Sequence, residues 1–461
     1  MLGKVGLGEL GIISSTAGMF GVFAGFGLGM TSTKYVAEHR FKDPAKAGRI
    51  MALTGLTAAV TGGTMALALA ILAPWLARHT LAAPHLTGLL KISALSLFLG
   101  ALNGAQVGAL GGFEAFRTGA ILALVGGIAS FPLVVGGVYL AGLSGAVWAG
   151  VASSGLSWLL CHLALRREAA RAGVPFTFSG CLQELPVLWR FSFPAFLSGT
   201  MVAPVTWACN AILVNQPNGY AEMGLFNVAG QWRSLVLFLP MTMGRVVLPL
   251  MCDAHGRGDV QRYAKVVGAN LRAIWAIALP ITVLGIGASP LLAQIYGREF
   301  IEARYVIAVL LLATFLNVVN GTVGQALVSS GKMWVGTIMN LAWAMVLLAS
   351  AQILVTQNGS LGLSVAYLIA YTAHTVWVMW YVQARLAPGI LERTKWLALA
   401  SIILIACAFL TRLSSSRACS AAFVGILVGL AIYAGMLAVP RFGFRQLASA
   451  ILSNNPRARC Q

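Results

Sequence analysis

The chain has 461 residues, of which 59% are hydrophobic and only 9% charged, against about 25% charged residues in soluble domains. This composition excludes a soluble enzyme or binding module and predicts a polytopic membrane protein. The formal net charge of +19 indicates contact with anionic lipid head groups and no nucleic-acid partner, because no soluble stretch carries the charge.

Apolar runs follow one another along the whole chain with short polar interruptions. Because about 20 apolar residues cross a bilayer as a helix, these runs predict an all-α fold with about 13 transmembrane helices. In chain order the runs cover residues 11–33, 50–77, 91–111, 118–140, 145–165, 189–213, 223–251, 267–286, 305–328, 333–355, 361–382, 396–410 and 418–439.

The Lys and Arg residues indicate the orientation. Most of the 31 fall in loops on one side of the predicted helices, and a minority fall on the other side. Loops rich in Lys and Arg stay in the cytoplasm during insertion. The pattern predicts a multi-pass protein of a bacterial cytoplasmic (inner) membrane, with a cytoplasmic C-terminus.

The second half of the chain repeats the first. The segment FLGALNGAQVGALGGFEAFRTGAI, residues 98–121, recurs 217 residues later as FLNVVNGTVGQALVSSGKMWVGTI. Further matches keep the same order, with a slowly drifting register: Asn103 with Asn320, Gly142 with Gly359, Gly145 with Gly362, His39 with His255, Asp43 with Asp259, and Lys46 with Arg262. Such ordered matches indicate two pseudo-symmetric lobes built on one unit.

The repeat predicts three regions. Residues 1–170 form an N-terminal lobe, residues 171–388 form a C-terminal lobe of six helices, and residues 389–461 add a helix pair with a basic tail. The run at 189–213 has no counterpart in the first half, where it would lie before Met1. The first lobe is therefore expected to hold helices 2–6 of the unit. A start site further upstream, a shortened chain and an uneven natural protein are the alternatives.

Arg233 is the candidate functional cation. It lies 11 residues after Glu222, hence about 16 Å along a helix, near the bilayer centre. Charged residues at this depth are costly and usually functional; the alternative is a structural bond to helix carbonyls. Arg245 lies nearer the cytoplasmic end, where its side chain can extend to the interface.

Amide side chains accompany Arg233 within the apolar runs. The pairs Asn103 and Gln106, and Asn317 and Asn320, each lie three residues apart on one helix face. A cavity with amides and one cation suits an anionic head group that carries hydroxyls, although a single amide more often bridges two helices. The candidate substrate-binding residues are Arg233, Gln231, Asn227, Asn103, Gln106, Asn317, Asn320 and Arg245.

The sequence lacks the motifs for nucleotide hydrolysis and for metal or disulfide sites. The sequence has no Gly-rich phosphate loop with Lys and Ser or Thr, and its seven cysteines include no CxxC pair. We therefore expect no cofactor, no metal, no catalytic residue and no enzymatic activity.

Three segments carry a resemblance to a known family: residues 8–49, residues 221–240 and residues 297–332, which reads GREFIEARYVIAVLLLATFLNVVNGTVGQALVSSGK. They resemble the O-antigen and exopolysaccharide flippases, the polysaccharide branch of the multidrug/oligosaccharidyl-lipid/polysaccharide (MOP) exporter superfamily. The resemblance implies two six-helix lobes around a central cavity and two further C-terminal helices. It also implies transport of a polyprenyl-diphosphate-linked glycan, with Arg233 as the best match to the arginines that bind the diphosphate. Gly25 and Phe26 stand where many relatives carry an acid.

Three functions follow as hypotheses. A lipid-linked oligosaccharide flippase, which interacts with membrane lipids and other polysaccharide-assembly proteins, is the first. A drug or cation antiporter of the same fold is the second and requires a buried carboxylate. A membrane-embedded glycosyltransferase or polymerase is the third and requires a catalytic external loop, whereas the external loops predicted here are short.

Overall fold

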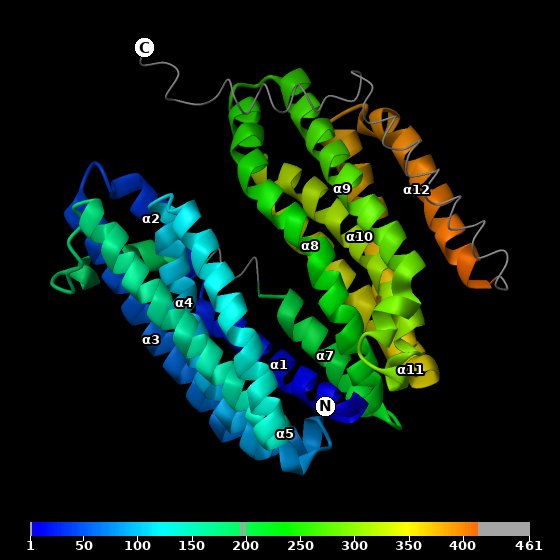
Figure 1. Ribbon diagram of the computed structural model, residues 1–461. Coiled ribbons are helices and arrows are strands. Elements are labelled where there is room, and N and C mark those ends of the chain that lie inside the picture. Colours follow the sequence, from blue (N-terminus) through cyan, green and yellow to red (C-terminus); the bar gives the residue numbers. More distant parts are fainter. Residues whose placement is uncertain (1, 194–195, 197–199, 414–461) are drawn as a thin grey trace. The chain divides into compact units, whose positions relative to one another are not determined.

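The computed structural model describes residues 2–193, 196 and 200–413, and every regular element in this part of the chain is helical (Figure 1). The main helices are α1 (Gly3–Gly25), α2 (Leu28–His39), α3 (Pro44–Trp75), α4 (Thr87–Gly112), α5 (Phe116–Arg171), α7 (Val202–Val214), α8 (Gly219–Gly256), α9 (Val260–Gln294), α10 (Ala303–Ser329), α11 (Met333–Arg385) and α12 (Ile390–Leu413). Among these residues, seven helical stretches are long and apolar enough to span a membrane. The all-α polytopic class is therefore confirmed. The count of 13 stays a prediction, since the run at 418–439 lies outside the described residues.

Two of these stretches are helical hairpins. α5 has 56 residues and α11 has 53, although about 20 residues suffice to cross a bilayer. In α5 the helix breaks at Ala141 and at Gly142, where φ is 56° and ψ is −130°. A side chain at Gly145 would collide with the carbonyl of Gly137, and residues eight apart in a straight helix would be about 12 Å apart. The chain therefore reverses at Gly142.

The same turn recurs where the repeat predicts it. In α11 the helix breaks at Asn358 and at Gly359, where φ is 51° and ψ is −128°. A side chain at Gly362 would collide with the Leu354 carbonyl, 217 residues after the matching pair in α5. A positive φ suits glycine, which has no Cβ to clash. The predicted matches of Gly142 with Gly359 and of Gly145 with Gly362 are confirmed.

A second repeated feature is the start of α3 and α9. The Asp43 carboxylate accepts a hydrogen bond from the Lys46 backbone N–H at 2.9 Å. The Asp259 carboxylate accepts one from Arg262 at 2.8 Å. Each aspartate therefore caps its helix by satisfying a backbone donor that has no partner within the helix.

The chain forms two compact units, Met1–Gly224 and Leu225–Gln461, the second described as far as residue 413. α7 belongs to the first unit, where it is bonded to α1. Trp207 Nε1 donates to Thr16 Oγ1 at 3.0 Å, and Asn210 Nδ2 donates to Ser15 Oγ at 2.8 Å. The division at residue 170 that the sequence suggests remains a prediction about the repeat.

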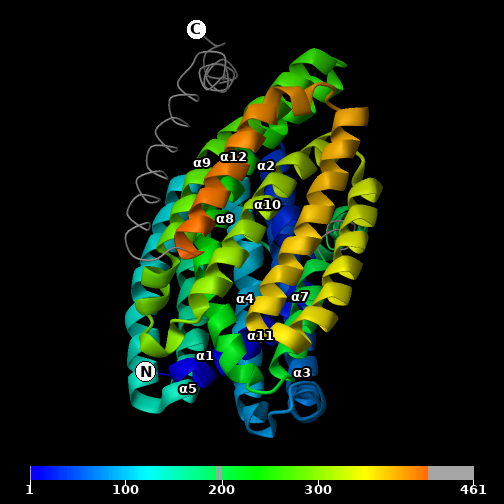
Figure 2. The ribbon, with the colours of Figure 1, turned by 90° about the vertical axis from the view of Figure 1, so that its right-hand side faces the viewer.

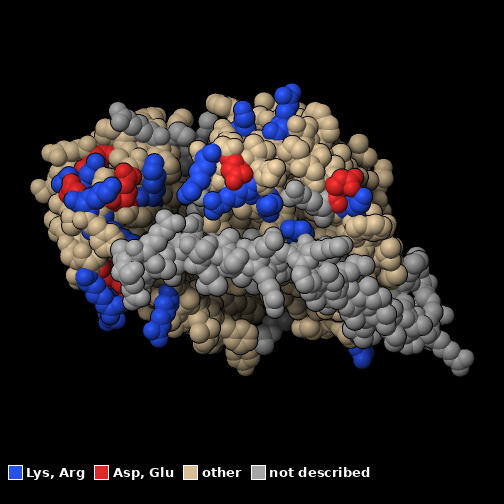
Figure 3. Space-filling view, turned by 90° about the horizontal axis from the view of Figure 1, so that it is seen from above, with Lys and Arg blue, Asp and Glu red and all other residues tan. Residues whose placement is uncertain are grey.

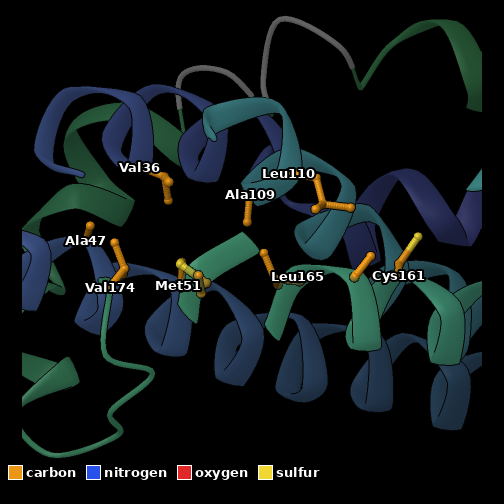
Figure 4. Packing of buried hydrophobic residues seen from close by; sticks show 10 residues of the cluster. Val36, Ala47, Met51, Ala109, Leu110, Cys161, Leu165 and Val174 are labelled. Atoms are coloured by element: carbon orange, nitrogen blue, oxygen red, sulfur yellow. The ribbon is translucent and has the colours of Figure 1, made fainter. Parts of the chain in front are cut away.

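Apolar side chains pack helices α2 to α5 of the first unit together. Figure 4 shows one apolar cluster, in which Val36 of α2, Met51 of α3, Ala109 and Leu110 of α4, and Leu165 of α5 are buried. Within lipid the hydrophobic effect does not drive such contacts, so helices associate through close packing and hydrogen bonds.

Helices α9 to α12 form the rest of the second unit (Figure 2). Tyr263 on α9 donates its hydroxyl proton to the Ala326 carbonyl of α10 at 2.8 Å. Trp275 Nε1, also on α9, donates to Ser401 Oγ of α12 at 2.6 Å. These buried polar groups are thus satisfied by neighbouring helices, as a membrane interior requires.

Ion pairs join the polar ends of the first unit's helices. Arg40 pairs with Glu114 at 2.9 Å, and Arg49 pairs with Glu184 at 3.0 Å. Figure 3 shows basic and acidic side chains mixed on the face seen from above. Both pairs lie in the region predicted to be cytoplasmic, and the second fixes the segment after α5 to α3.

We expect Gly362→Ala to destabilise the α11 hairpin. The added methyl group meets the Leu354 backbone, and such overpacking costs about 1–3 kcal/mol. The matched control is Gly336→Ala in the same helix, where the new Cβ meets Leu327 Cδ1 at 3.9 Å, an ordinary contact. Thermal unfolding of the full-length protein in detergent checks this, and equal midpoints for the two variants would contradict it.

Candidate functional site

Arg233 lies within α8 in the second unit, against the second half of α11. Its guanidinium carbon is 5.4 Å from the centroid of the Tyr367 ring, over which it lies. The hydroxyl of Tyr371, one helical turn after Tyr367, forms a hydrogen bond with Arg233. Two tyrosines on one face of α11 therefore contact the cation, Tyr367 through its ring and Tyr371 through its hydroxyl oxygen.

The two tyrosines are themselves held by aromatic stacking. Tyr367 stacks on Phe226 with the ring centroids 5.9 Å apart, and on Tyr371 at 6.1 Å. Trp343 contacts Tyr371 at 5.4 Å. Tyr367 is 1% exposed and Tyr371 6% exposed. Aromatic pairs at these distances contribute about 0.5–1.5 kcal/mol each beyond burial, so the side chains around Arg233 are fixed in place.

The charge of Arg233 is not neutralised by an acid in the part of the chain that the structure describes. The ion pairs found there join other arginines, lysines and histidines to their carboxylates. A cation–π contact and a phenol oxygen stabilise a guanidinium but leave its net charge of +1. Arg233 is half-buried, so its remaining N–H donors can reach a ligand.

Of the four predicted amides in this unit, Asn320 contacts the tyrosine pair. Asn320 Nδ2 donates to the Tyr371 carbonyl at 3.4 Å, and its Oδ1 is buried without a partner among the described residues. Gln231 Oε1 accepts a hydrogen bond from the Tyr296 hydroxyl at 2.8 Å. Asn227 and Asn317 are half-buried on α8 and α10.

Asn103 and Gln106 lie in the first unit. Gln106 Nε2 is 3.3 Å from His162 Nδ1. Asn103 lines a cavity of about 180 Å³ with Gly100, Ser153, Ser154 and Ser157. The predicted site residues thus fall into two groups, one in each unit. Arg245 belongs to neither group, because its side chain lies outside those that the structure describes.

A larger cavity of about 710 Å³ adjoins this one in the first unit. Residues of α1, α2, α4 and α5 line it, and Gly100 and Ser154 border both cavities. Glycine, alanine and serine dominate the lining, and none of the described lining residues of either cavity is charged. The first unit therefore offers a neutral space and the second a cation.

Sequence reasoning missed the partners of Arg233 and the serines of α5. Tyr367, Tyr371 and His374 share one helix face through their spacing of four and three residues. Ser157 likewise lies four residues after Ser153 and three after Ser154. These spacings are visible in the sequence, but nothing local connects them to a cation on α8. No group of acids, histidines and cysteines among the described residues could hold a metal ion.

Comparison with known proteins identifies relatives. A family model described as "Polysaccharide biosynthesis protein" matches residues 1–255. The EPS I polysaccharide export inner membrane protein EpsE of Ralstonia nicotianae is 26% identical over 175 residues, which are 37% of this chain and 39% of that protein. The match therefore spans less than half the length of this curated relative.

Two solved structures share the fold. An inward-facing multidrug resistance MATE family transporter of the MOP superfamily has a TM-score of 0.70 and 15% identity, over 86% of this chain and 92% of that one. Lipid II flippase MurJ in an inward closed conformation has a TM-score of 0.65 and 15% identity, over 96% of this chain and 98% of its own. At these identities the likeness concerns the fold alone.

We expect Arg233→Met to leave thermal stability unchanged or to raise it. A cation without a counter-ion at the centre of a membrane helix costs about 2.5–3.5 kcal/mol on insertion scales, and methionine removes that cost while filling similar space. The control is Arg49→Met, which leaves Glu184 without its partner and is expected to cost about 1–3 kcal/mol. Unfolding midpoints in detergent check both. A large loss of stability in Arg233→Met would show that the cation is structural.

Proposed function

The chain belongs to the polysaccharide biosynthesis protein family, and on that premise we propose that it flips a polyprenyl-diphosphate-linked oligosaccharide across a bacterial inner membrane. The lipid-linked glycan would move from the cytoplasmic to the outer leaflet for O-antigen or exopolysaccharide synthesis. Two similar proteins support this proposal. The sequence relative EpsE is a polysaccharide export inner membrane protein, and the structural neighbour MurJ is a lipid II flippase. The chain would act as a transporter and not as an enzyme.

The observation that carries the proposal is the un-neutralised Arg233. Tyr367 lies against the face of the guanidinium, and Tyr371 takes one hydrogen bond. A guanidinium has five N–H donors around its edge. The edge therefore keeps donors for the oxygens of a diphosphate, which arginine binds through paired, charge-assisted hydrogen bonds.

The membrane potential assists this direction of transport. An anionic substrate that leaves an inside-negative cytoplasm gains about 2.3 kcal/mol per charge per 100 mV. A diphosphate bound at Arg233 travels with much of its charge compensated, and the lobes of the repeat would alternate access to the two leaflets. In this scheme the chain has about 13 transmembrane helices and a cytoplasmic C-terminus, and polysaccharide-assembly proteins supply and receive the substrate.

An antiporter for cationic drugs is the alternative that the shared fold allows. It requires a carboxylate in the binding site to attract the drug and to exchange with a coupling ion. The described residues around Arg233 present instead a cation, two phenols and an indole. The sign of this charge favours an anionic substrate. A glycosyltransferase or polymerase has no support in the groups around Arg233, which include no acid.

We expect Arg233→Ala in the full-length gene to reduce surface polymer at least tenfold and to cause lipid-linked precursor to accumulate. The reason is the loss of the group that compensates the diphosphate charge within the membrane. Polymer on intact cells and extracted precursor are the measurements, with protein abundance in the membrane confirmed. The matched control is Arg304→Ala, since Arg304 also lies over a tyrosine, Tyr305, at 4.6 Å, but at the start of α10.

Normal export by Arg233→Ala would contradict a role for this cation in substrate binding. If Arg233→Ala left export normal and a deletion of the gene increased sensitivity to cationic drugs, the antiporter would be the better function.

A further inference from the structure

The two units can be compared position by position through their matching hairpins. Because the turns at Gly142 and Gly359 have nearly identical dihedral angles, the second half of α5 corresponds to the second half of α11 at a shift of 217 residues. On this correspondence Gly150 matches Tyr367, Ser154 matches Tyr371, and Ser157 matches His374. Asn103 on α4, which packs against α5, matches Asn320 on α10, which packs against α11.

In the second unit large side chains fill this region. Tyr367 and Tyr371 stack on each other and on Phe226, and Asn320 donates to the Tyr371 carbonyl. His374 is the next of these side chains on the helix, and its Nδ1 is buried. Two phenol rings and an imidazole therefore occupy the space on this face of α11.

In the first unit the corresponding positions are small, and the space is open. Gly150 and Ser154 line the cavity of about 710 Å³, while Asn103, Ser154 and Ser157 line the adjoining cavity of about 180 Å³. A Cβ built on Gly150 would meet only Ser96 Oγ, at 4.0 Å. The cavities thus lie where the second unit places two aromatic rings and an imidazole, and they have room for rings of that size.

Polar atoms in this space lack partners. Asn103 Oδ1 and Ser153 Oγ, which belong to residues that line the smaller cavity, are buried without hydrogen bonds among the described residues. Leaving a buried acceptor or donor unsatisfied is costly, so a polar ligand that supplies hydrogen bonds is favoured. Dispersed hydroxyl and amide groups suit a ligand that both donates and accepts.

We propose that the cavity of the first unit binds sugar rings of the transported glycan, at the positions where the second unit carries Tyr367, Tyr371 and His374. This inference rests on the proposed function and deepens it, because it assigns the neutral, hydroxyl-rich part of the substrate to one unit.

The chemistry favours a glycan over the other candidate ligands. None of the described lining residues is charged, and an alkali cation in a low-dielectric site without a carboxylate would pay its desolvation cost uncompensated. A lipid chain would leave Asn103 Oδ1 and Ser153 Oγ unsatisfied. Pyranose rings are close in size to phenol rings and carry hydroxyls that pair with serine and amide groups.

The test compares two lipids that differ only in the sugar. Full-length protein in detergent is titrated with undecaprenyl diphosphate and with the lipid-linked oligosaccharide extracted from a polymer-producing strain that lacks this gene. Gly150→Tyr fills the cavity with the side chain found at the matching position of α11. We expect it to weaken oligosaccharide binding at least tenfold and to leave the Kd for undecaprenyl diphosphate within about twofold.

Two further variants make the result specific. Gly127→Tyr adds the same side chain to the same helix at an exposed glycine with open space around it, and is expected to change neither Kd. Ser154→Ala/Ser157→Ala keeps the cavity open and removes two hydroxyls. It is expected to weaken oligosaccharide binding about tenfold, because two hydrogen bonds to sugar hydroxyls are lost.

The outcomes separate this inference from the function on which it rests. Unchanged oligosaccharide binding in Gly150→Tyr and in the double serine variant would overturn the proposal that this cavity binds the glycan. If Arg233→Ala nevertheless lost binding of both lipids, the flippase proposal would stand. If the unmodified protein bound neither lipid, both proposals would fall.

Discussion

A cation inside a membrane is stable only where protein groups replace its hydration shell. Around Arg233 this replacement is partial, because Tyr367 covers the face of the guanidinium and Tyr371 takes one hydrogen bond, and no acid among the described residues cancels the charge. The arrangement depends on a column of stacked rings from Phe226 to Trp343 that ties α8 to α11. These ring contacts therefore hold the tyrosines, and with them the guanidinium, in a fixed place.

The two units have matching backbone folds but differ in the side chains that these folds enclose. Their hairpin turns and their aspartate caps correspond, so the matching helices of the two units have equivalent courses. The side chains on those helices differ in volume, with Tyr367 and Tyr371 in one unit and Gly150 and Ser154 in the other. A duplicated unit thus provides two unlike environments without a change of fold.

Sequence reasoning identified features that depend on local chemistry. Arg233 was identifiable because a charge interrupts an apolar run, and the turn glycines because identical residues recur in register. The partners of Arg233 could not be predicted in this way, since α8 and α11 are separated by two helices along the chain and a tyrosine in a membrane helix has many uses. The cavities of the first unit could not be predicted from the sequence either, because a cavity is the volume that side chains far apart in the sequence leave empty. Asn103 lies among polar residues in the structure, and its serine neighbours on α5 could not be recognised from the sequence. Arg245 and the run at 418–439 remain untested by the described residues.

The hairpins also bear on how the chain enters the membrane. In α5 and α11 two spans are joined by a reversal of two residues, which leaves no loop to be translocated separately. Each hairpin carries basic residues at both of its open ends, Arg117 and Arg171 in α5, and Lys332 and Arg385 in α11. Lys and Arg next to a span resist translocation, so a hairpin with basic residues at both ends is suited to insertion as one piece, with both ends kept on the same side. The turn glycines would then matter for insertion as well as for transport.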